Sequence, residues 1–357
     1  MRSKSLLLCA SLLGLSVVFM APARAQTMNL VYANSLVKTH VQFGVMADEW
    51  IAEIRSATSG RVLIRHVPGG ALLKLENMLE GLRGGVADIG VTNVSNFAGQ
   101  LPIAATLAGI ADITYGNKVD TIGLSLITLK LLEEFPQFSK DFEDLGLRPA
   151  VWIPTPTFAV IARNPLAKLD DFKGKKIRAF GVGLPKILAA AGATPLAVAA
   201  GEVYTSLQTG VIDGAMSDQP NMLASRWYEQ AKHIITTGPG AGAQTMAIGV
   251  AYIFNLNSWN KISKADQAII GRINSKFTLA AGRRMQATGE QASVELKTKG
   301  VTISHLSNEE TAELARRLPD LLKTAAEIMN TAGRPGTAIV KRYTELADAY
   351  AKGLLKP

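Results

Sequence analysis

Cysteine is nearly absent from this 357-residue chain, whose single cysteine is Cys9. Cys9 lies in an apolar run over residues 6–20 that follows a positively charged start and precedes the small-residue pattern Ala23-Arg24-Ala25. These features predict a secretory signal peptide over residues 1–25, cleaved after Ala25, and no lipid attachment at Cys9, because leucines precede it. Without that segment the chain has no cysteine, which excludes disulfides, thiolate nucleophiles and cysteine-bound metals or iron–sulfur clusters.

Long apolar runs are also lacking beyond the signal, because no other segment approaches the ~20 residues that a membrane helix needs. The formal net charge of +9 falls to about +6 once the three basic residues of the signal are removed. The remaining basic residues are scattered, and no basic run is interleaved with aromatic residues. We therefore expect an exported protein that does not bind nucleic acid and whose mildly basic surface weakly favours anionic small molecules or a membrane surface.

The common catalytic and metal-binding motifs are missing as well. The chain contains no H-E-x-x-H, no G-x-S-x-G, no Walker A sequence and no EF-hand loop, and its four histidines are far apart. No cofactor and no metal ion is therefore expected. Catalytic side chains from distant segments can still converge in a fold, so an exported enzyme that acts on organic acids stays open as an alternative.

The chain does contain an alternation of strand and helix patterns. The first stretch predicts, in order, strand, helix, strand, helix and strand at residues 28–33, 40–60, 61–67, 73–85 and 87–92. This order implies a parallel α/β sheet with right-handed crossovers. The same order recurs at residues 175–216, and about 330 mature residues suffice for two lobes of ordinary domain size.

The rest of the chain predicts connections between these lobes. Residues 152–166 are rich in proline and threonine and suit a crossing from the first lobe to the second. An apolar strand is expected at 245–256, followed by a helix at 263–299 that is longer than typical globular helices. A strand at 301–305 and amphipathic helices over 308–354 complete the prediction.

The segment FKGKKIRAFGVGLPK, residues 172–186, has three readings as an anion site: basic patch, phosphate loop or carboxylate clamp. Gly181-x-Gly183 lacks the third glycine of a dinucleotide fingerprint, which favours a tight turn. Strand alternation places Lys176, Arg178 and Phe180 on one face, with Arg178 near the carboxyl end of the strand, where open α/β sheets bind ligands. The planar guanidinium suits a bidentate grip on a carboxylate, although these residues alone favour a surface arginine.

Two segments together resemble a known family. Residues 57–91, and residues 172–217 with their G-x-K-I-R, G-A-x-P, E-V-Y-x-x-L-Q-T-G and V-I-D-G patterns, resemble the extracytoplasmic solute-binding proteins of tripartite ATP-independent periplasmic (TRAP) transporters, dicarboxylate-binding (DctP) type. The resemblance extends from about residue 28 to beyond residue 330. It implies an α/β, two-lobed periplasmic-binding-protein fold (type II-like) with a central ligand cleft and a long lobe-spanning helix.

The resemblance also implies a function and a division of the chain. The protein would capture a small organic acid, without catalysis, and deliver it to an ion-driven permease with a large and a small membrane subunit. A monomer is expected, and service to a sensor kinase or an ABC permease stays an alternative. The implied division is a signal peptide at 1–25, the first part of lobe I at 26–152, the first part of lobe II at 153–242, a return to lobe I at 243–262, and bracing and C-terminal helices at 263–357.

Site residues follow from the same resemblance. Arg178 matches the family's signature arginine, which pairs with the ligand carboxylate. Ser217, followed by Asp218, stands where many members have asparagine, and Ala200 stands where sialic-acid-binding members have phenylalanine. These departures disfavour a sialic acid or a strongly polar diacid and favour a less polar 2-oxo, hydroxy or aromatic monocarboxylate. Aromatic residues that suit such a ligand, or equally form plain core, are Phe158, Phe180 and Trp152, and the other matching positions are Asn34, Lys74, Asn93 and Gln244.

Overall fold

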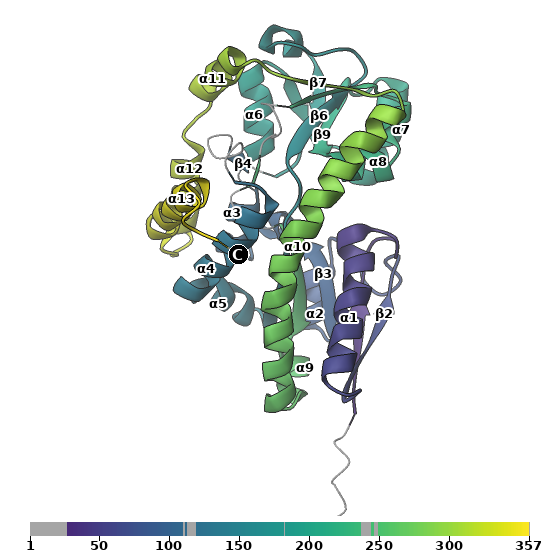
Figure 1. Cartoon of the computed structure of the whole chain (residues 1–357), viewed down its shortest axis with the longest axis vertical. Helices are drawn as coiled ribbons and strands as arrows, with labels where there is room; N and C mark the ends of the chain where they lie inside the picture. Colours follow the sequence, from purple (N-terminus) through teal and green to yellow (C-terminus); the bar gives the residue numbers. More distant parts are fainter. Residues whose placement is uncertain are drawn as a thin grey trace, which may run out of the picture.

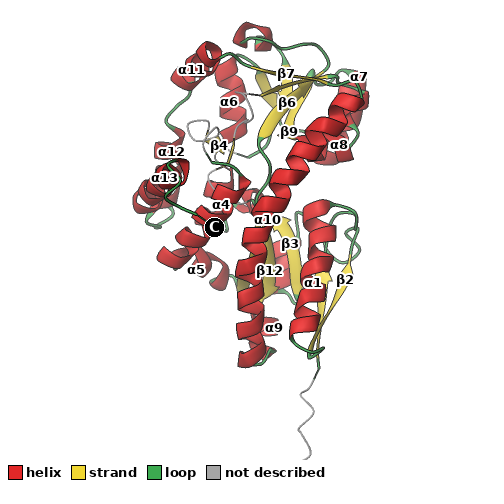
Figure 2. Cartoon of the chain, in the orientation of Figure 1, coloured by secondary structure: helices red, strands yellow, loops and turns green. Residues whose placement is uncertain are grey.

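The computed structural model describes residues 27–109, 111–112, 119–181, 183–236, 244–245 and 249–356. Two mixed sheets, one above the other in Figure 1, form the centres of two α/β lobes, and a single long helix runs beside both. Helices cover the sheets in each lobe (Figure 2). The predicted two-lobed α/β fold with a lobe-spanning helix is therefore confirmed.

Lobe I is the part of the chain built on the five-stranded sheet, whose strand order is β2-β1-β3-β12-β5. Strands β1, β2 and β3 are parallel, as predicted, whereas β12 is antiparallel to both of its neighbours. The prediction made no statement on the direction of the 245–256 strand, because side-chain periodicity does not specify strand direction. The strands are β1 (Met28–Ala33), β2 (Val62–Val67), β3 (Ile89–Asn93), β5 (Leu147–Ile153) and β12 (Val250–Asn255).

Lobe II is built on the six-stranded sheet, whose strand order is β13-β10-β6-β9-β7-β8. Here β6 is antiparallel to both neighbours, β9 and β10, while β7 is parallel to β8 and β9. Each sheet therefore contains one reversed strand next to a lobe crossing. The strands are β6 (Phe158–Ala162), β7 (Lys176–Arg178), β8 (Thr194–Leu196), β9 (Gly214–Asp218), β10 (His233–Thr236) and β13 (Thr302–His305); β4 (Ala111–Asp112) and β11 (Gln244–Thr245) form a separate antiparallel pair.

Helices of lobe I, lobe II and the C-terminal region pack on these sheets and on one another. Those of lobe I are α1 (Met46–Ala57), α2 (Met78–Arg83), α3 (Pro102–Gly109), α4 (Thr121–Glu134), α5 (Gln137–Glu143) and α9 (Leu256–Lys261). Those of lobe II are α6 (Gly183–Ala191), α7 (Val203–Thr209), α8 (Gln219–Ala224) and α11 (Asn308–Arg317). The last two, α12 (Leu321–Thr331) and α13 (Gly336–Ala351), pair with each other and contact α3 and α4.

Helix α2 starts later than the pattern at 73–85 predicts. Its first residue is Met78, and the Leu73 side chain lies against Gly81 of the helix instead of belonging to it. A Cβ atom on Gly81 would lie 2.0 Å from Leu73 Cδ2, so the missing side chain provides the room for this contact. The helix predicted at 40–60 is likewise divided, into a π-helical turn, Val41–Val45, and α1.

Helix α10 (Lys264–Thr298) has 35 residues and contacts α4 and β5 of lobe I and α8 of lobe II. Its packing on α4 is close at Gly282, where a Cβ atom would lie 2.7 Å from Ser125 Oγ. The Thr121 hydroxyl of α4 also donates a hydrogen bond of 2.7 Å to the Gly282 carbonyl. The predicted long helix is therefore confirmed, and a glycine lets it lie against lobe I.

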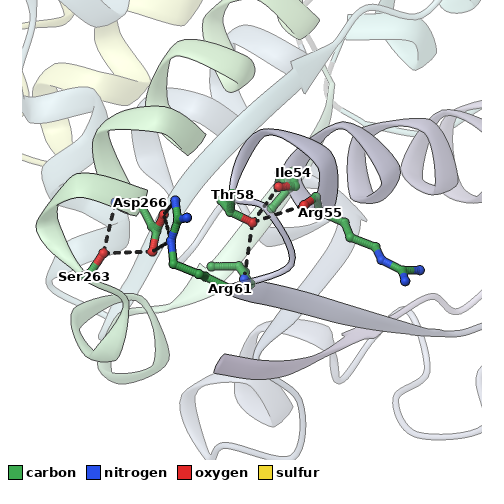
Figure 3. Close-up of polar contacts among 7 residues, drawn as sticks. Ile54, Arg55, Thr58, Arg61, Ser263 and Asp266 are labelled. Carbon is green, nitrogen blue, oxygen red and sulfur yellow. Dashed lines mark hydrogen bonds and ion pairs between the residues drawn. The ribbon is translucent and has the colours of Figure 1, made fainter. Parts of the chain in front are cut away.

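The N-terminus of α10 is anchored by an ion pair (Figure 3). Ser263 caps the helix through the Asp266 amide, and the buried Asp266 carboxylate binds Arg61 Nε and Nη2 at 3.1 and 2.7 Å from its Oδ1. Arg61 precedes β2, and the nearby Thr58 hydroxyl, which donates to the Ile54 carbonyl, ends α1. The pair with Arg61 lowers the pKa of Asp266. The end of α10 is thus tied to the α1–β2 connection of lobe I.

Candidate functional site

Arg178 is the last residue of β7, and its side chain is held by the backbone of two neighbouring segments. Its Nε donates to the Val198 carbonyl at 3.1 Å, and its Nη1 donates to the Met216 carbonyl at 3.4 Å. The guanidinium carbon lies 4.6 Å from the centre of the Phe180 ring. Arg178 is 7 % exposed, so it is not the surface arginine that the sequence alone allowed.

The charge of this guanidinium is not balanced by any carboxylate in the part of the chain that the structure describes. No carboxylate forms an ion pair with Arg178 within the described ranges, and its Nη2 has no hydrogen-bond acceptor among them. Burial lowers the pKa of Arg178 to about 10, which leaves the group protonated at neutral pH. A buried charge without a partner costs free energy, and a bound anion would remove that cost.

The three aromatic residues predicted to suit the ligand differ in whether they contact Arg178. The Phe180 ring is half-buried, covers the guanidinium and meets the Phe158 ring edge-on, with centroids 5.6 Å apart. Phe158 is 4 % exposed and belongs to the apolar core. Trp152 is also core, because it is 2 % exposed and packs edge-on against Phe138 and Phe142 of lobe I. Of the three aromatics, only Phe180 contacts the Arg178 charge.

Ser217 and Asp218 lie at the end of β9, next to β7. Arg178 pairs with Ala215 in the parallel register, so Ser217, two residues on, shares the Arg178 face of the sheet. The buried Ser217 Oγ accepts a hydrogen bond of 3.0 Å from Asn221 Nδ2, and the Ser217 hydroxyl hydrogen-bonds to the Asp218 carboxyl.

Asp218 is the N-cap of α8, where its Oδ1 accepts from the Asn221 amide at 2.9 Å. Burial raises the pKa of Asp218 to about 6. Sequence reasoning missed Asn221, which lies three residues after Asp218, a residue type that signals a helix start at the N-cap position. Asp218 and Asn221 together fix the chain that presents Ser217.

Lobe I presents neutral amides at the ends of two strands. Asn34 follows β1, is 1 % exposed, accepts from the Leu36 amide at 2.8 Å and contacts His66 Nε2 through its Nδ2 at 3.2 Å. Asn93 ends β3, and its Oδ1 accepts from the Ser95 amide and hydroxyl at 3.1 and 2.8 Å. Both side chains are therefore oriented by hydrogen bonds within lobe I.

Lys74 is exposed and bends toward the loop that follows β2. Its Nζ lies 3.3 Å from where a Cβ atom of Gly70 would be, and the Gly70 amide donates to the Asn34 carbonyl at 2.9 Å. The structure thus brings Lys74 near Asn34. The predicted site residues form two groups, one on each lobe, and the side chain of Gln244 lies outside the described residues.

The chain matches the family model of the bacterial extracellular solute-binding proteins, family 7 (DctP), over residues 32–328. It belongs to this family. Membership confirms the prediction that the chain is a solute-binding protein of TRAP transporters and that it is not an enzyme. The family's partners are a small-molecule ligand and a membrane permease.

Relatives and solved structures agree with this assignment. The C4-dicarboxylate-binding periplasmic protein DctP of Rhodobacter capsulatus is 26 % identical over 304 residues, which is 84 % of this chain and 86 % of the relative. A TRAP solute-binding protein from Desulfovibrio salexigens has a TM-score of 0.78 at 23 % identity and covers 90 % of this chain and 96 % of its own. One from Bordetella bronchiseptica with bound (R)- and (S)-mandelate has a TM-score of 0.77 at 23 % identity, with 90 % and 99 % covered. These two likenesses show the periplasmic-binding-protein fold.

The described residues give no sign of a metal centre or of a membrane span. Among them, no cluster of three or more histidine, aspartate or glutamate side chains has the arrangement of a metal site. In the same part of the chain, no helix is both long and apolar enough to cross a membrane.

Proposed function

We propose that this member of family 7 binds a small monocarboxylate between its lobes, with Arg178 as the carboxylate ligand. The observation that supports this most directly is the buried, protonated guanidinium without a carboxylate partner in the described chain. Two backbone carbonyls hold it in place, so little side-chain entropy is lost when an acid binds. The charge-assisted pair then supplies most of the affinity.

The second group of residues gives the ligand contacts on lobe I. We propose that Asn34, Asn93 and Lys74 contact the polar atoms of the acid that Arg178 does not bind. Gln244, on the segment that returns from lobe II to lobe I, would supply a further contact. Contacts from both lobes exist together only when the lobes close, so the ligand shifts the population toward the closed form. An ion-driven TRAP permease with a large and a small membrane subunit would then recognise that form.

The chemistry around Arg178 favours a less polar acid with one further hydrogen-bonding group. The Phe180 ring offers an apolar face beside the carboxylate position, and the second lone pair of Ser217 Oγ, on the same face of the sheet as Arg178, can accept from a 2-hydroxy group. The half-buried Asp218 carboxylate disfavours a second negative charge nearby. The fold neighbour with bound mandelate, an aromatic 2-hydroxy acid, fits this class.

We further propose that the chain acts as a periplasmic monomer after cleavage following Ala25, because the family relatives are periplasmic proteins. The lobe bounds given above stay a prediction. The membership of β5 and β12 in one sheet and of β6, β9 and β10 in the other supports them.

The test is a comparison of acids with their neutral isosteres. The protein is unfolded to remove bound ligand, refolded, and screened by thermal shift against mandelate, phenylpyruvate, lactate, pyruvate and succinate. A true ligand at ~100 times its dissociation constant adds ~2.7 kcal/mol of stability. We expect at least one monocarboxylate to stabilise the protein and its amide, such as mandelamide for mandelate, to have no effect. Equal stabilisation by the amide, or none by any monocarboxylate, contradicts the proposal.

A further inference from the structure

A row of polar side chains leads from the surface of lobe I to Asn34. Lys38 Nζ lies 3.4 Å from Asp48 Oδ2, and Asp48 Oδ1 lies 2.8 Å from His66 Nδ1. The His66 side chain is 7 % exposed, and its Nε2 lies 3.2 Å from Asn34 Nδ2. Residues separated by 32 positions in the chain meet here because β1 and β2 are parallel, with Tyr32 opposite His66.

The donors and acceptors of this row allow one arrangement when His66 is neutral. An ionised Asp48 can only accept, so His66 Nδ1 carries the proton and Nε2 is an acceptor. Asn34 Nδ2 then donates to Nε2, and its Oδ1 accepts from the Leu36 amide at 2.8 Å. Nδ2 has two protons, and His66 uses one, so the second is available to a ligand oxygen.

We infer that His66, oriented by Asp48, is a positioning residue that fixes the side-chain amide of Asn34 and so presents one Nδ2 proton to the bound acid. This inference rests on the proposed function, because it takes Asn34 to be a ligand contact. His66 itself need not touch the acid. The Tyr32 ring meets the imidazole edge-on at 5.1 Å and keeps it in place.

Asp48 and, behind it, Lys38 are the charged groups beside the imidazole, while the Tyr32 hydroxyl donates to the Phe43 carbonyl.

The first experiment needs no ligand. Nitrogen-15 NMR of the full mature protein at pH 8 reports which ring nitrogen of His66 bears the proton. We expect the proton on Nδ1 and none on Nε2, and a slowly exchanging Asn34 side-chain amide that exchanges faster in His66→Phe. A proton on Nε2, or an Asn34 amide unaffected by the substitution, overturns the inference.

The second experiment is a double-mutant cycle with mandelate as the probe, measured by calorimetry at pH 8. His66→Phe keeps the ring against Tyr32 but removes both nitrogens, and we expect it to weaken binding roughly tenfold. In the Asn34→Ala background the same substitution should change affinity less than about twofold, because His66 acts through Asn34. His66→Gln, whose amide oxygen can accept from Asn34, should recover part of the affinity.

The controls separate this inference from the proposed function. Urea midpoints of each variant show whether it is folded under the binding conditions. Equal weakening by His66→Phe in both backgrounds means that His66 has only a structural role and contradicts the inference, while acid binding itself stands. Absence of mandelate binding by the wild type bears on the ligand class, and the tautomer measurement then decides the inference alone.

Discussion

The two lobes hold their polar site residues by opposite means. Lobe II contains a buried charge, Arg178, whose side chain is fixed by two carbonyls and balanced by no carboxylate among the described residues. Lobe I contains neutral amides, Asn34 and Asn93, whose oxygens are already satisfied by nearby backbone amides. An anion therefore relieves an unfavourable charge on lobe II, whereas it gains only directional hydrogen bonds on lobe I.

The long helix α10 is also attached differently to the two lobes. On lobe I it packs closely at Gly282, pairs Asp266 with Arg61, and forms ion pairs from Arg284 and Lys276 to α1. On lobe II its described side-chain hydrogen bond to α8 joins Ser293 and Gln219. Polar side chains of α10 therefore attach mainly to lobe I, whereas on lobe II the helix is held by apolar packing, with Leu296 fully buried in that lobe's core.

The largest expected effect is the loss of acid binding in Arg178→Ala. Removing one partner of a buried charged pair costs about 2–5 kcal/mol, so calorimetry should show at least about thirtyfold weaker binding of the acid identified by thermal shift. Asn34→Ala, the matched change on lobe I, should weaken it about tenfold or less. Arg178→Lys should also bind poorly, because an ammonium group cannot donate the two parallel hydrogen bonds of a planar guanidinium. Equal losses of acid affinity in Arg178→Ala and Asn34→Ala would contradict the proposed difference between the two lobes.

A second prediction compares two glycines of α10. Gly282→Ala places a Cβ atom 2.7 Å from Ser125 Oγ and 2.8 Å from the Thr121 carbonyl, and we expect it to destabilise the protein by about 1–3 kcal/mol. Gly271→Ala, on the same helix, meets nothing within 4 Å and should stabilise by about 0.4–1 kcal/mol. Chemical denaturation measures both. The same sign for the two changes would show that α10 is not closely packed on lobe I.

The smallest expected effects are on the pH dependence of stability. They have opposite signs for Asp218 and Asp266, which lie at the N-terminal ends of α8 and α10. Burial raises the pKa of Asp218 to about 6. The contribution of Asp218 to the free energy of unfolding is therefore fully present below its unfolded-state pKa of about 3.9, and it is lost as the pH rises through 6. Asp218→Asn keeps the cap and should therefore gain about 1–2 kcal/mol at pH 7.5 and nothing at pH 4.

Asp266 behaves in the opposite way. The pKa of Asp266 is lowered in the folded protein. Its contribution to the free energy of unfolding is therefore present above the unfolded-state pKa, and it is lost as the pH falls through the folded-state pKa. Asp266→Asn should lower the melting temperature by a few degrees at pH 7.5 and by less at pH 3. Thermal melts of both variants from pH 3 to 8 measure the two slopes, and parallel slopes would contradict the assignment.

Much of the fold follows from local patterns. The strand at 28–33 was predicted at its observed bounds, and the predicted helix at 263–299 differs from α10 by one residue at each end. Strand direction was not predictable, because β12 and β6 have the same apolar periodicity whether they run parallel or antiparallel. Phe158 and Trp152 could not be assigned to pocket or core either, because burial depends on which elements pack against them.

The sequence by itself determined that the chain is an α/β protein with a long bracing helix, and its segment order and motifs identified the TRAP solute-binding family. Alternation and helical periodicity depend on neighbours a few residues apart, which a sequence displays directly. Only the tertiary structure decided that Arg178 is buried with no counter-charge among the described residues, and that His66 lies between Asp48 and Asn34. Desolvation and hydrogen-bond partners arise from segments distant in the chain, so they exist only once the sheets have set the strands in register.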